Sequence, residues 1–175
     1  FALLDLDETA KIIVQPGGQG RNDPDAAFKT AQSTIENLSD WARERLVLEN
    51  GDRTFSLERV VRLGEATGLP VTFDWQHHWL NHDDSLSDDD NVRLVERAFN
   101  LWHDRPPKIH VSSPKSEKQP RLHADYVDVE FIQPLGDLLK AVKPGTVDVM
   151  VDAKLNDLAL FKLRDEWNGD QAAEP

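Results

Sequence analysis

The sequence predicts an α/β fold in which short parallel strands alternate with helices. Five short segments are rich in branched aliphatic residues, and near-continuous apolar runs of this kind are typical of strands buried on both faces of a parallel sheet. Stretches with apolar residues at helical spacing lie between these segments. Each segment also carries a polar residue at or near its carboxyl end. The predicted strands are 11–15, 45–49, 70–74, 108–112 and 148–152.

The helices between the strands have recognisable ends. Asp23 is followed by Pro24, a cap residue and then a first-turn proline, and this pair predicts a helix to about Leu38. Ser56 caps a second helix, which Gly68 ends just before the next strand. Apolar spacing predicts three further helices, at about 89–103, 132–142 and 154–167.

The polar residues at the strand ends decide between two arrangements of such a fold. They are Gln15, Glu49, Asp74, His110 and Asp152. In a (β/α)8 barrel the active site lies at the carboxyl ends of the strands and takes residues from many of them. A doubly wound sheet more often has a glycine-rich phosphate loop after its first strand, and the glycines at 17–20 lack that spacing. The sequence therefore favours a (β/α)8 TIM barrel.

The length of the chain suits one domain, but less than a whole barrel. The chain has 175 residues and its only methionine is Met150, so a chain that begins at Phe1 is expected to be part of a longer product. A closed barrel needs eight strands, so roughly three βα units are expected upstream and the chain is read as the C-terminal five. We expect one TIM-barrel part at 1–167 and a frayed tail at 168–175.

Composition excludes several kinds of site. The chain has no cysteine, so a metal would have to be held by histidine, carboxylate or amide groups. The net charge of −12 argues against binding to nucleic acid through bulk electrostatics alone. No apolar run approaches the roughly 20 residues of a membrane span, and the amino end lacks the basic flank of a signal peptide. A soluble, intracellular protein without membrane contacts is expected.

Two motifs are candidates for metal chemistry. Asp74, His77 and His78 lie within five residues at a strand end, and their alternative is a pair of surface or capping histidines. Glu49 ends an apolar run, where a carboxylate is costly unless it is paired, exposed or coordinating.

Two further strand-end residues extend the candidate site. His110 alone would more often be a hydrogen-bonded core residue, and Asp152 carries the same alternative. If the strand ends converge, these two residues join Glu49 and Asp74 in a site suited to Mn, Zn or Fe. Two or more such metals could generate hydroxide and neutralise a phosphate oxyanion.

Five segments together resemble the UV damage endonuclease family. They are Leu46–Arg53, Phe73–His78, Lys108–Ser113, His123–Tyr126 and Asp148–Lys154. They come in the family's order after a Pro16-Gly-Gly turn and cover essentially the whole chain. The resemblance implies a metal-dependent TIM barrel that nicks DNA immediately 5′ to ultraviolet photoproducts, typically with manganese.

The resemblance also assigns residues. It makes Glu49 a bridging and catalytic carboxylate and Lys108 a catalytic lysine that meets phosphate or metal-bound oxygen. It implies two or three Mn²⁺ sites in the complete barrel. The implied metal ligands are Glu49, Asp74, His110 and Asp152 around one metal, with His77 and His123 at a further one. His78, His82 and His103 receive no role.

Two positions depart from the family pattern. Gln15 stands where the family usually has histidine, and an amide oxygen is a poorer ligand than imidazole. Asp152 stands where the family usually has the longer glutamate. Either fewer metals are bound or activity is reduced.

The implied partner is ultraviolet-damaged double-stranded DNA. A basic groove would have to offset the acidic net charge. Its candidate residues are Arg53, Lys108, Lys115, Lys118 and Arg121. The protein is expected to be a cytoplasmic monomer, associated with the nucleoid in a prokaryote.

Two other functions compete with this interpretation. A sugar isomerase or epimerase on the same barrel suits the acidic surface better, but has no need of the basic loop between Lys115 and Arg121. A degenerate barrel that binds without cutting fits Gln15 and Asp152, and such a site would be expected to purify without metal.

Overall fold

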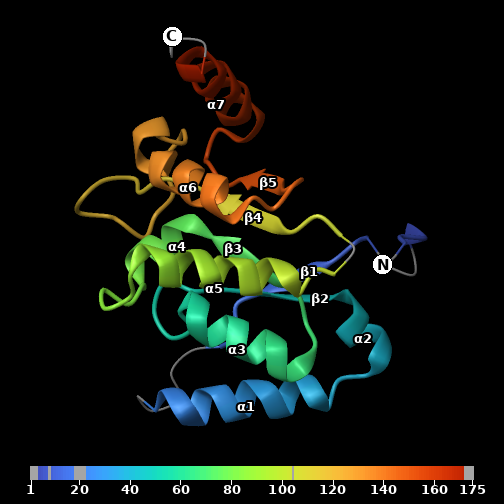
Figure 1. Cartoon of the computed structure of the whole chain (residues 1–175). Helices are drawn as coiled ribbons and strands as arrows, with labels where there is room; N and C mark the ends of the chain where they lie inside the picture. The colour runs from blue at the N-terminus through green and yellow to red at the C-terminus, as the bar shows by residue number, and fades with distance from the viewer. Residues whose placement is uncertain (1–3, 8, 18–22, 104, 172–175) are drawn as a thin grey trace.

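The core of the structure is one parallel sheet. The computed structural model describes residues 4–7, 9–17, 23–103 and 105–171. Its strands are β1 (Ile12–Val14), β2 (Leu46–Glu49), β3 (Val71–Asp74), β4 (Lys108–Val111) and β5 (Asp148–Val151). They are all parallel and lie in the order β1-β2-β3-β4-β5, so each strand pairs with the next one along the chain (Figure 1).

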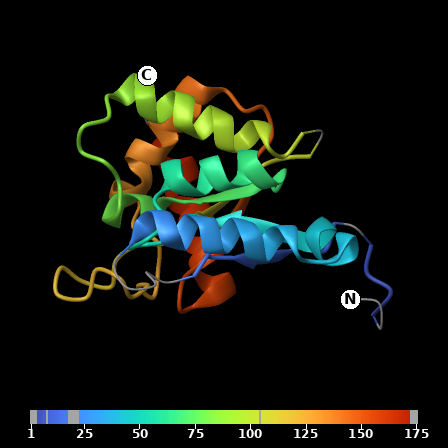
Figure 2. The same cartoon turned by 90° about the horizontal axis from the view of Figure 1, so that it is seen from below.

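Helices connect the strands and form an outer layer. They are α1 (Pro24–Glu36), α2 (Asp40–Arg45), α3 (Leu57–Thr67), α4 (Trp75–Leu80), α5 (Asp88–Asn100), α6 (Val129–Val142) and α7 (Asn156–Gln171). Helix α1 packs on α3, α3 on α5, α5 on α6 and α6 on α7. Figures 1 and 2 show α1, α3 and α5 side by side. Sequential parallel strands with this helix layer form part of a (β/α)8 barrel, which confirms the predicted fold class.

The alternation of side chains along each strand separates an apolar face from a polar one. Leu48, Phe73 and Ile109 point toward the helices and belong to the buried core. The residues that follow them, Glu49, Asp74 and His110, point to the opposite face, which would be the inside of a closed barrel. The sheet therefore carries its core on one side and its ionisable groups on the other.

Helix α4 was not predicted. It begins directly after β3 because the Asp74 carboxylate caps it, with Oδ1 accepting from the His77 backbone N–H at 2.7 Å. The short helix α2 was also missed, and Ser39 caps it in the same way. In both places a capping side chain starts a short helix that has no clear apolar period of its own.

Several predicted ends move in the structure. Helix α6 begins at Val129 rather than 132, because the Asp128 side chain accepts from the Glu130 N–H and caps it. Helix α5 ends at Asn100, earlier than the predicted 103, and α7 begins at Asn156. Helix α7 continues to Gln171, past the predicted end at 167, while residues 172–175 of the predicted tail lie outside the described residues.

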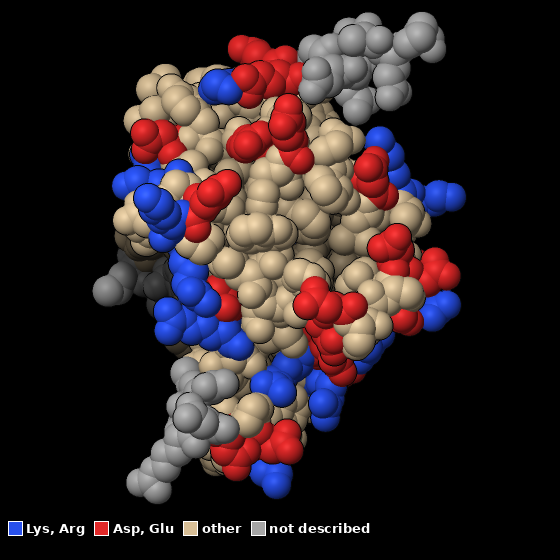
Figure 3. Space-filling view, turned by 90° about the vertical axis from the view of Figure 1, so that its left-hand side faces the viewer, with Lys and Arg blue, Asp and Glu red and all other residues tan. Residues whose placement is uncertain are grey.

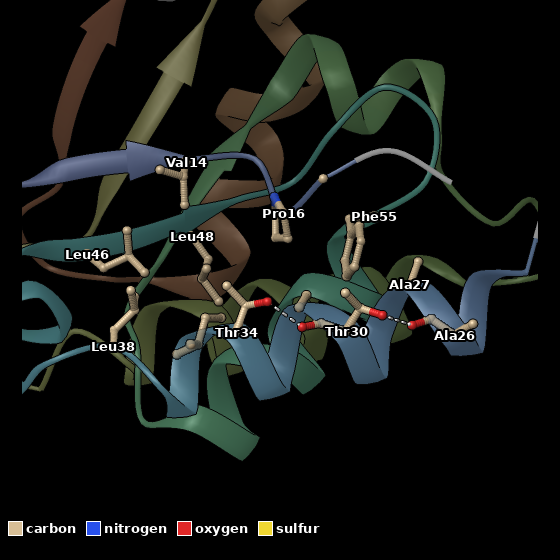
Figure 4. A pocket seen from close by; sticks show the side chains of 13 residues that line it. Val14, Pro16, Ala26, Ala27, Thr30, Thr34, Leu38, Leu46, Leu48 and Phe55 are labelled. Atoms are coloured by element: carbon tan, nitrogen blue, oxygen red, sulfur yellow. Dashed lines mark hydrogen bonds between the residues drawn. The ribbon is translucent and has the colours of Figure 1, made fainter. Parts of the chain in front are cut away.

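An apolar cavity of about 390 Å³ lies on the helix side of the sheet, between α1 and the strands β1 and β2 (Figure 4). Val14 and Leu48 line it from the strands. The hydroxyls of Thr30 and Thr34 donate to helix carbonyls one turn earlier, so these side chains offer the cavity little free polar surface. The cavity is separated by the sheet from the polar face that carries Glu49.

None of the described helices combines the length and the apolar character needed to cross a membrane.

Candidate metal centre

Three strand ends bring two carboxylates and one imidazole together. Glu49 ends β2, Asp74 ends β3 and His110 is the third residue of β4. One ligand atom from each lies within 4.8 Å of the others, and all three residues are buried. They meet because neighbouring parallel strands present their carboxyl ends at the same edge of the sheet. The sequence predicted this group.

Glu49 is held at both carboxylate oxygens. Its Oε1 lies 2.5 Å from Nδ1 of His110, and its Oε2 accepts a hydrogen bond from Nε2 of Gln15 at 3.0 Å. Burial raises the pKa of Glu49, but the hydrogen bonds from His110 and Gln15 outweigh burial, so that its pKa lies below the ordinary value. Glu49 is therefore an ionised carboxylate with a fixed orientation. Gln15, for which the sequence predicts a poor metal ligand, supports Glu49 through its amide N–H, and ligation by its oxygen stays a prediction.

Asp74 is the most deeply buried acid of the group, at 1% exposure. Burial raises its pKa to about 6, against the favourable contacts with His77. His77 follows one turn later on α4, with Nδ1 3.5 Å from Asp74 Oδ1 and 3.0 Å from the backbone carbonyl of Asn50. Because a carbonyl only accepts, Nδ1 carries the proton, and Nε2 is left with the lone pair that a metal needs.

His110 has one paired and one unpaired ring nitrogen. Nδ1 faces Glu49 and lies 3.6 Å from Oδ2 of Asp152, whereas Nε2 is buried without a hydrogen-bond partner. Burial lowers the pKa of His110, but the hydrogen bond and charge of Glu49, with the charge of Asp152, outweigh burial and raise it. Buried acids thus surround an imidazole with an unsatisfied nitrogen. This donor set fits a divalent cation that takes oxygen and nitrogen ligands.

Asp152 and His123 lie at the rim of the group. Asp152 follows β5, and its side chain is 37% exposed. His123 belongs to the loop after β4, where its backbone pairs with Pro114. Burial lowers the pKa of His123, while the charges of Asp152 and Glu49 act in the opposite direction, so His123 is within electrostatic reach of both acids. Ligation by either residue stays a prediction.

Lys108 has a partner that the sequence did not suggest. Its ammonium donates to Oδ2 of Asp148 at 2.8 Å, and these residues face each other at the first positions of β4 and β5. Lys108 is on the same face as His110 but two positions nearer the amino end of the strand. Its predicted catalytic role stays a prediction.

His78 is a core residue rather than a ligand. Its ring packs against Phe73, with ring centroids 5.4 Å apart, and against Trp75 at 6.1 Å. Burial lowers its pKa to about 4, so the imidazole is neutral near neutral pH. Of the two adjacent histidines in this motif, His77 alone faces the acidic group.

The predicted basic residues are exposed, except for the half-buried Lys108. Arg53 and Arg121 meet around one acid, with their Nε atoms 3.8 and 2.7 Å from Oδ2 of Asp52. Lys115 and Lys118 lie on the loop after β4 and face solvent. Figure 3 shows the face toward which the strands run, where acidic and basic side chains are interspersed and the largest basic group lies along the left margin.

Sequence reasoning missed Asn50. This fully buried residue follows Glu49, and its side chain pairs with both backbone groups of Asp74: Nδ2 donates to the carbonyl at 2.9 Å and Oδ1 accepts from the N–H at 2.8 Å. Its own carbonyl lies against His77. Asn50 thereby fixes the end of β2 to the end of β3. The signal in the sequence that could have identified Asn50 was its position next to Glu49 in the segment Leu46–Arg53.

Residues 1–173 match the family described as UV-endonuclease UvdE. The chain belongs to this family. The motifs that carry the resemblance in the sequence include the strand ends that form the buried acidic group.

Named UvdE relatives are similar over almost the whole chain. The UV DNA damage endonuclease of Bacillus pumilus (strain SAFR-032) is 38% identical over 167 residues, which are 93% of this chain and 50% of the relative. That of Bacillus cereus (strain B4264) is 32% identical over 171 residues, 95% of this chain and 52% of the relative. The chain spans about half the length of the curated relatives it matches.

A solved structure has the same fold. The crystal structure of SacUVDE superimposes with a TM-score of 0.72 at 24% sequence identity. The match covers 89% of this chain and 51% of that one.

Proposed function

We propose that this chain is part of a metal-dependent DNA repair endonuclease that cleaves the phosphodiester on the 5′ side of ultraviolet photoproducts, both cyclobutane pyrimidine dimers and 6-4 photoproducts. The observation that carries the proposal is the buried group of Glu49, Asp74 and His110 at the carboxyl ends of the barrel strands, in a member of the UvdE family. Active sites of TIM barrels lie at these strand ends.

The donor set favours a hard or borderline divalent cation, and Mn²⁺ is the one we propose. Glu49, Asp74 and His110 would hold it, with Asp152 beside them. His77 and His123 would serve a further cation. When bound, such cations neutralise charge on the phosphate and lower the pKa of a water molecule that can attack it.

The chain's own residues hold this group in place before substrate arrives. Gln15 and His110 fix the two oxygens of Glu49, and Asn50 fixes the backbone of Asp74. A site that is already ordered loses little free energy to reorganisation during the reaction. The second layer of contacts therefore supports catalysis through geometry rather than through contact with the substrate.

Exposed cations at the same end of the strands would meet the DNA backbone. They are Arg53, Lys115, Lys118 and Arg121. A photoproduct weakens stacking, which makes kinking or flipping of the duplex cheap at the damaged step. Recognition would then depend on the deformability of the damaged duplex, with the cations contacting phosphates on either side.

An incision assay tests the proposed function. We expect the full-length protein with Mn²⁺ to nick an end-labelled duplex once, immediately 5′ to a single thymine dimer, and to leave the undamaged duplex intact. Addition of a chelator should abolish the nick. No nick despite bound Mn²⁺, or equal nicking of both duplexes, would contradict the proposal.

Metal affinity is expected to fall at acid pH. Binding needs Asp74 ionised and His110 neutral. Burial raises the pKa of Asp74 to about 6, and the hydrogen bond and charge of Glu49 raise the pKa of His110 from its ordinary value. Below these values each group must release a proton to bind metal, so Mn²⁺ affinity should drop by about tenfold per pH unit for each proton.

Isothermal titration calorimetry measures this dependence. Titrations in two buffers of different ionisation enthalpy, repeated across the acid range, give both the affinity and the number of protons released. An affinity that stays constant between about pH 5 and pH 7 would contradict the assignment, because the raised carboxyl pKa requires proton release in this window.

A further inference from the structure

The loop after β4 is an ordered hairpin-like segment. We call residues 113–124 the β4 loop. Its arms pair through the N–H of Lys115, which donates to the carbonyl of Leu122 at 2.7 Å, and through the N–H of Ala124, which donates to Ser113 at 2.9 Å. In Figures 1 and 2 the loop projects at the left, the end toward which the strands run. The loop carries Lys115, Lys118, Arg121 and His123.

The side chain of Gln76 holds this loop through two hydrogen bonds. It is the second residue of α4 and is 1% exposed. Its Nε2 donates to the backbone carbonyl of Pro120 at 2.7 Å, and its Oε1 accepts from the hydroxyl of Ser112 at 2.5 Å. Because the carbonyl of Pro120 only accepts, the orientation of the amide is fixed. One buried side chain thus joins the base of the β4 loop to its far arm.

The same contacts tie the loop to the candidate metal centre. Helix α4 starts at the Asp74 cap, so Gln76 lies two residues beyond a proposed ligand. A second tether of the loop, Arg121 to Asp52, is a partly exposed ion pair, and such pairs contribute little. The buried amide is costly to leave unsatisfied, so its bonds resist separation more strongly.

We propose that Gln76 is a positioning residue that holds the β4 loop beside the Glu49–Asp74–His110 group, so that the loop's cations contact the phosphates flanking the cleaved bond. The proposal rests on the proposed function, since it assigns part of the DNA contact to this loop. Gln76 contributes no ligand and no proton. It acts through the placement of the loop, and sequence analysis gave it no role.

Replacing Gln76 with methionine tests the proposal. Gln76→Met keeps the length of the side chain and removes both hydrogen bonds. Gln32→Met is the matched control, because the Gln32 amide donates to Glu36 on the exposed surface of α1, away from the β4 loop. In the 175-residue chain, hydrogen exchange should become at least about tenfold faster at the amides of Lys115 and Ala124, and stay unchanged in β2 and β3.

DNA binding and metal binding separate positioning from general damage. In the full-length protein with Mn²⁺, Gln76→Met should raise the Kd for a thymine-dimer duplex by about tenfold. This change corresponds to the loss of roughly one hydrogen bond between the β4 loop and the DNA. The affinity for Mn²⁺ alone should not change. Gln32→Met should alter neither quantity.

Each outcome decides the proposal. Unchanged hydrogen exchange in the β4 loop would overturn the claim that Gln76 holds the loop. Faster hydrogen exchange in the loop with an unchanged Kd for DNA would overturn the loop's role in DNA contact. Faster exchange throughout β2 and β3 would make the effect a general loss of stability, and would also overturn it. If Gln76→Met does not fold, Ser112→Ala removes one bond alone and should show the same pattern at smaller amplitude.

Failure of the proposed function gives a different result. If the wild-type protein does not bind damaged DNA, both the function and the loop's role in it are wrong, whereas the exchange measurements still report whether Gln76 fastens the loop.

Discussion

Replacing Glu49 with glutamine is expected to remove most of the incision activity. The carboxylate accepts from Gln15 at one oxygen and faces Nδ1 of His110 at the other. A glutamine amide offers one oxygen, so its NH₂ group would face a donor on one side, and the negative charge that a cation needs would be gone. We expect the 5′ nick to fall by roughly 100- to 1000-fold, as when one preorganised electrostatic contact is removed from an active site.

Metal binding and incision are measured on the same protein. Calorimetry should show Mn²⁺ affinity reduced by at least about tenfold, in line with the loss of contacts to a charged group. Glu36→Gln is the matched control, because Glu36 also accepts from a glutamine amide but on the exposed surface of α1. Full incision by the Glu49→Gln variant would contradict the assignment of Glu49 to the candidate metal centre.

Replacing Gly64 with alanine is expected to destabilise the fold, although helix propensity alone favours alanine by about 1 kcal/mol. Gly64 lies inside α3, where the helix packs against the sheet. An added Cβ would lie 2.8 Å from the side chains of Leu101 and Val71 and from the backbone carbonyl of Leu69. The carbonyl cannot rotate away as a side chain can, so we expect a loss of about 1–3 kcal/mol in the free energy of unfolding, as in other overpacked cores.

The reverse substitution at Ala66, on the same helix, is the comparison for Gly64→Ala. It is exposed, so Ala66→Gly should lose about 1 kcal/mol through propensity alone. Urea unfolding of the chain, followed by circular dichroism, measures both variants. Gly64→Ala with equal or higher stability would show that the close approach of α3 to β3 is not tight.

The strands and the central acidic group could be predicted because their signals are local. A short aliphatic run with a polar end identifies a strand, and five of them in alternation with helices indicate a parallel sheet. In such a sheet the carboxyl ends meet at one edge, so Glu49, Asp74 and His110 follow from the order of the segments. The resemblance to the UV damage endonucleases depends on the same residues, and the family match bears it out.

The supporting contacts depend on the tertiary structure. Asn50 meets the backbone of Asp74, 24 positions away, and Gln76 meets Ser112, 36 positions away. Lys108 pairs with Asp148 because the register of β4 and β5 places them opposite each other. Polar side chains of these types have no period that marks their partners, and a register set by the packing of whole strands decides which groups meet. The sequence by itself determined the sheet and the acidic group at the carboxyl ends of its strands, whereas the packing of the strands and loops decided how that group is held.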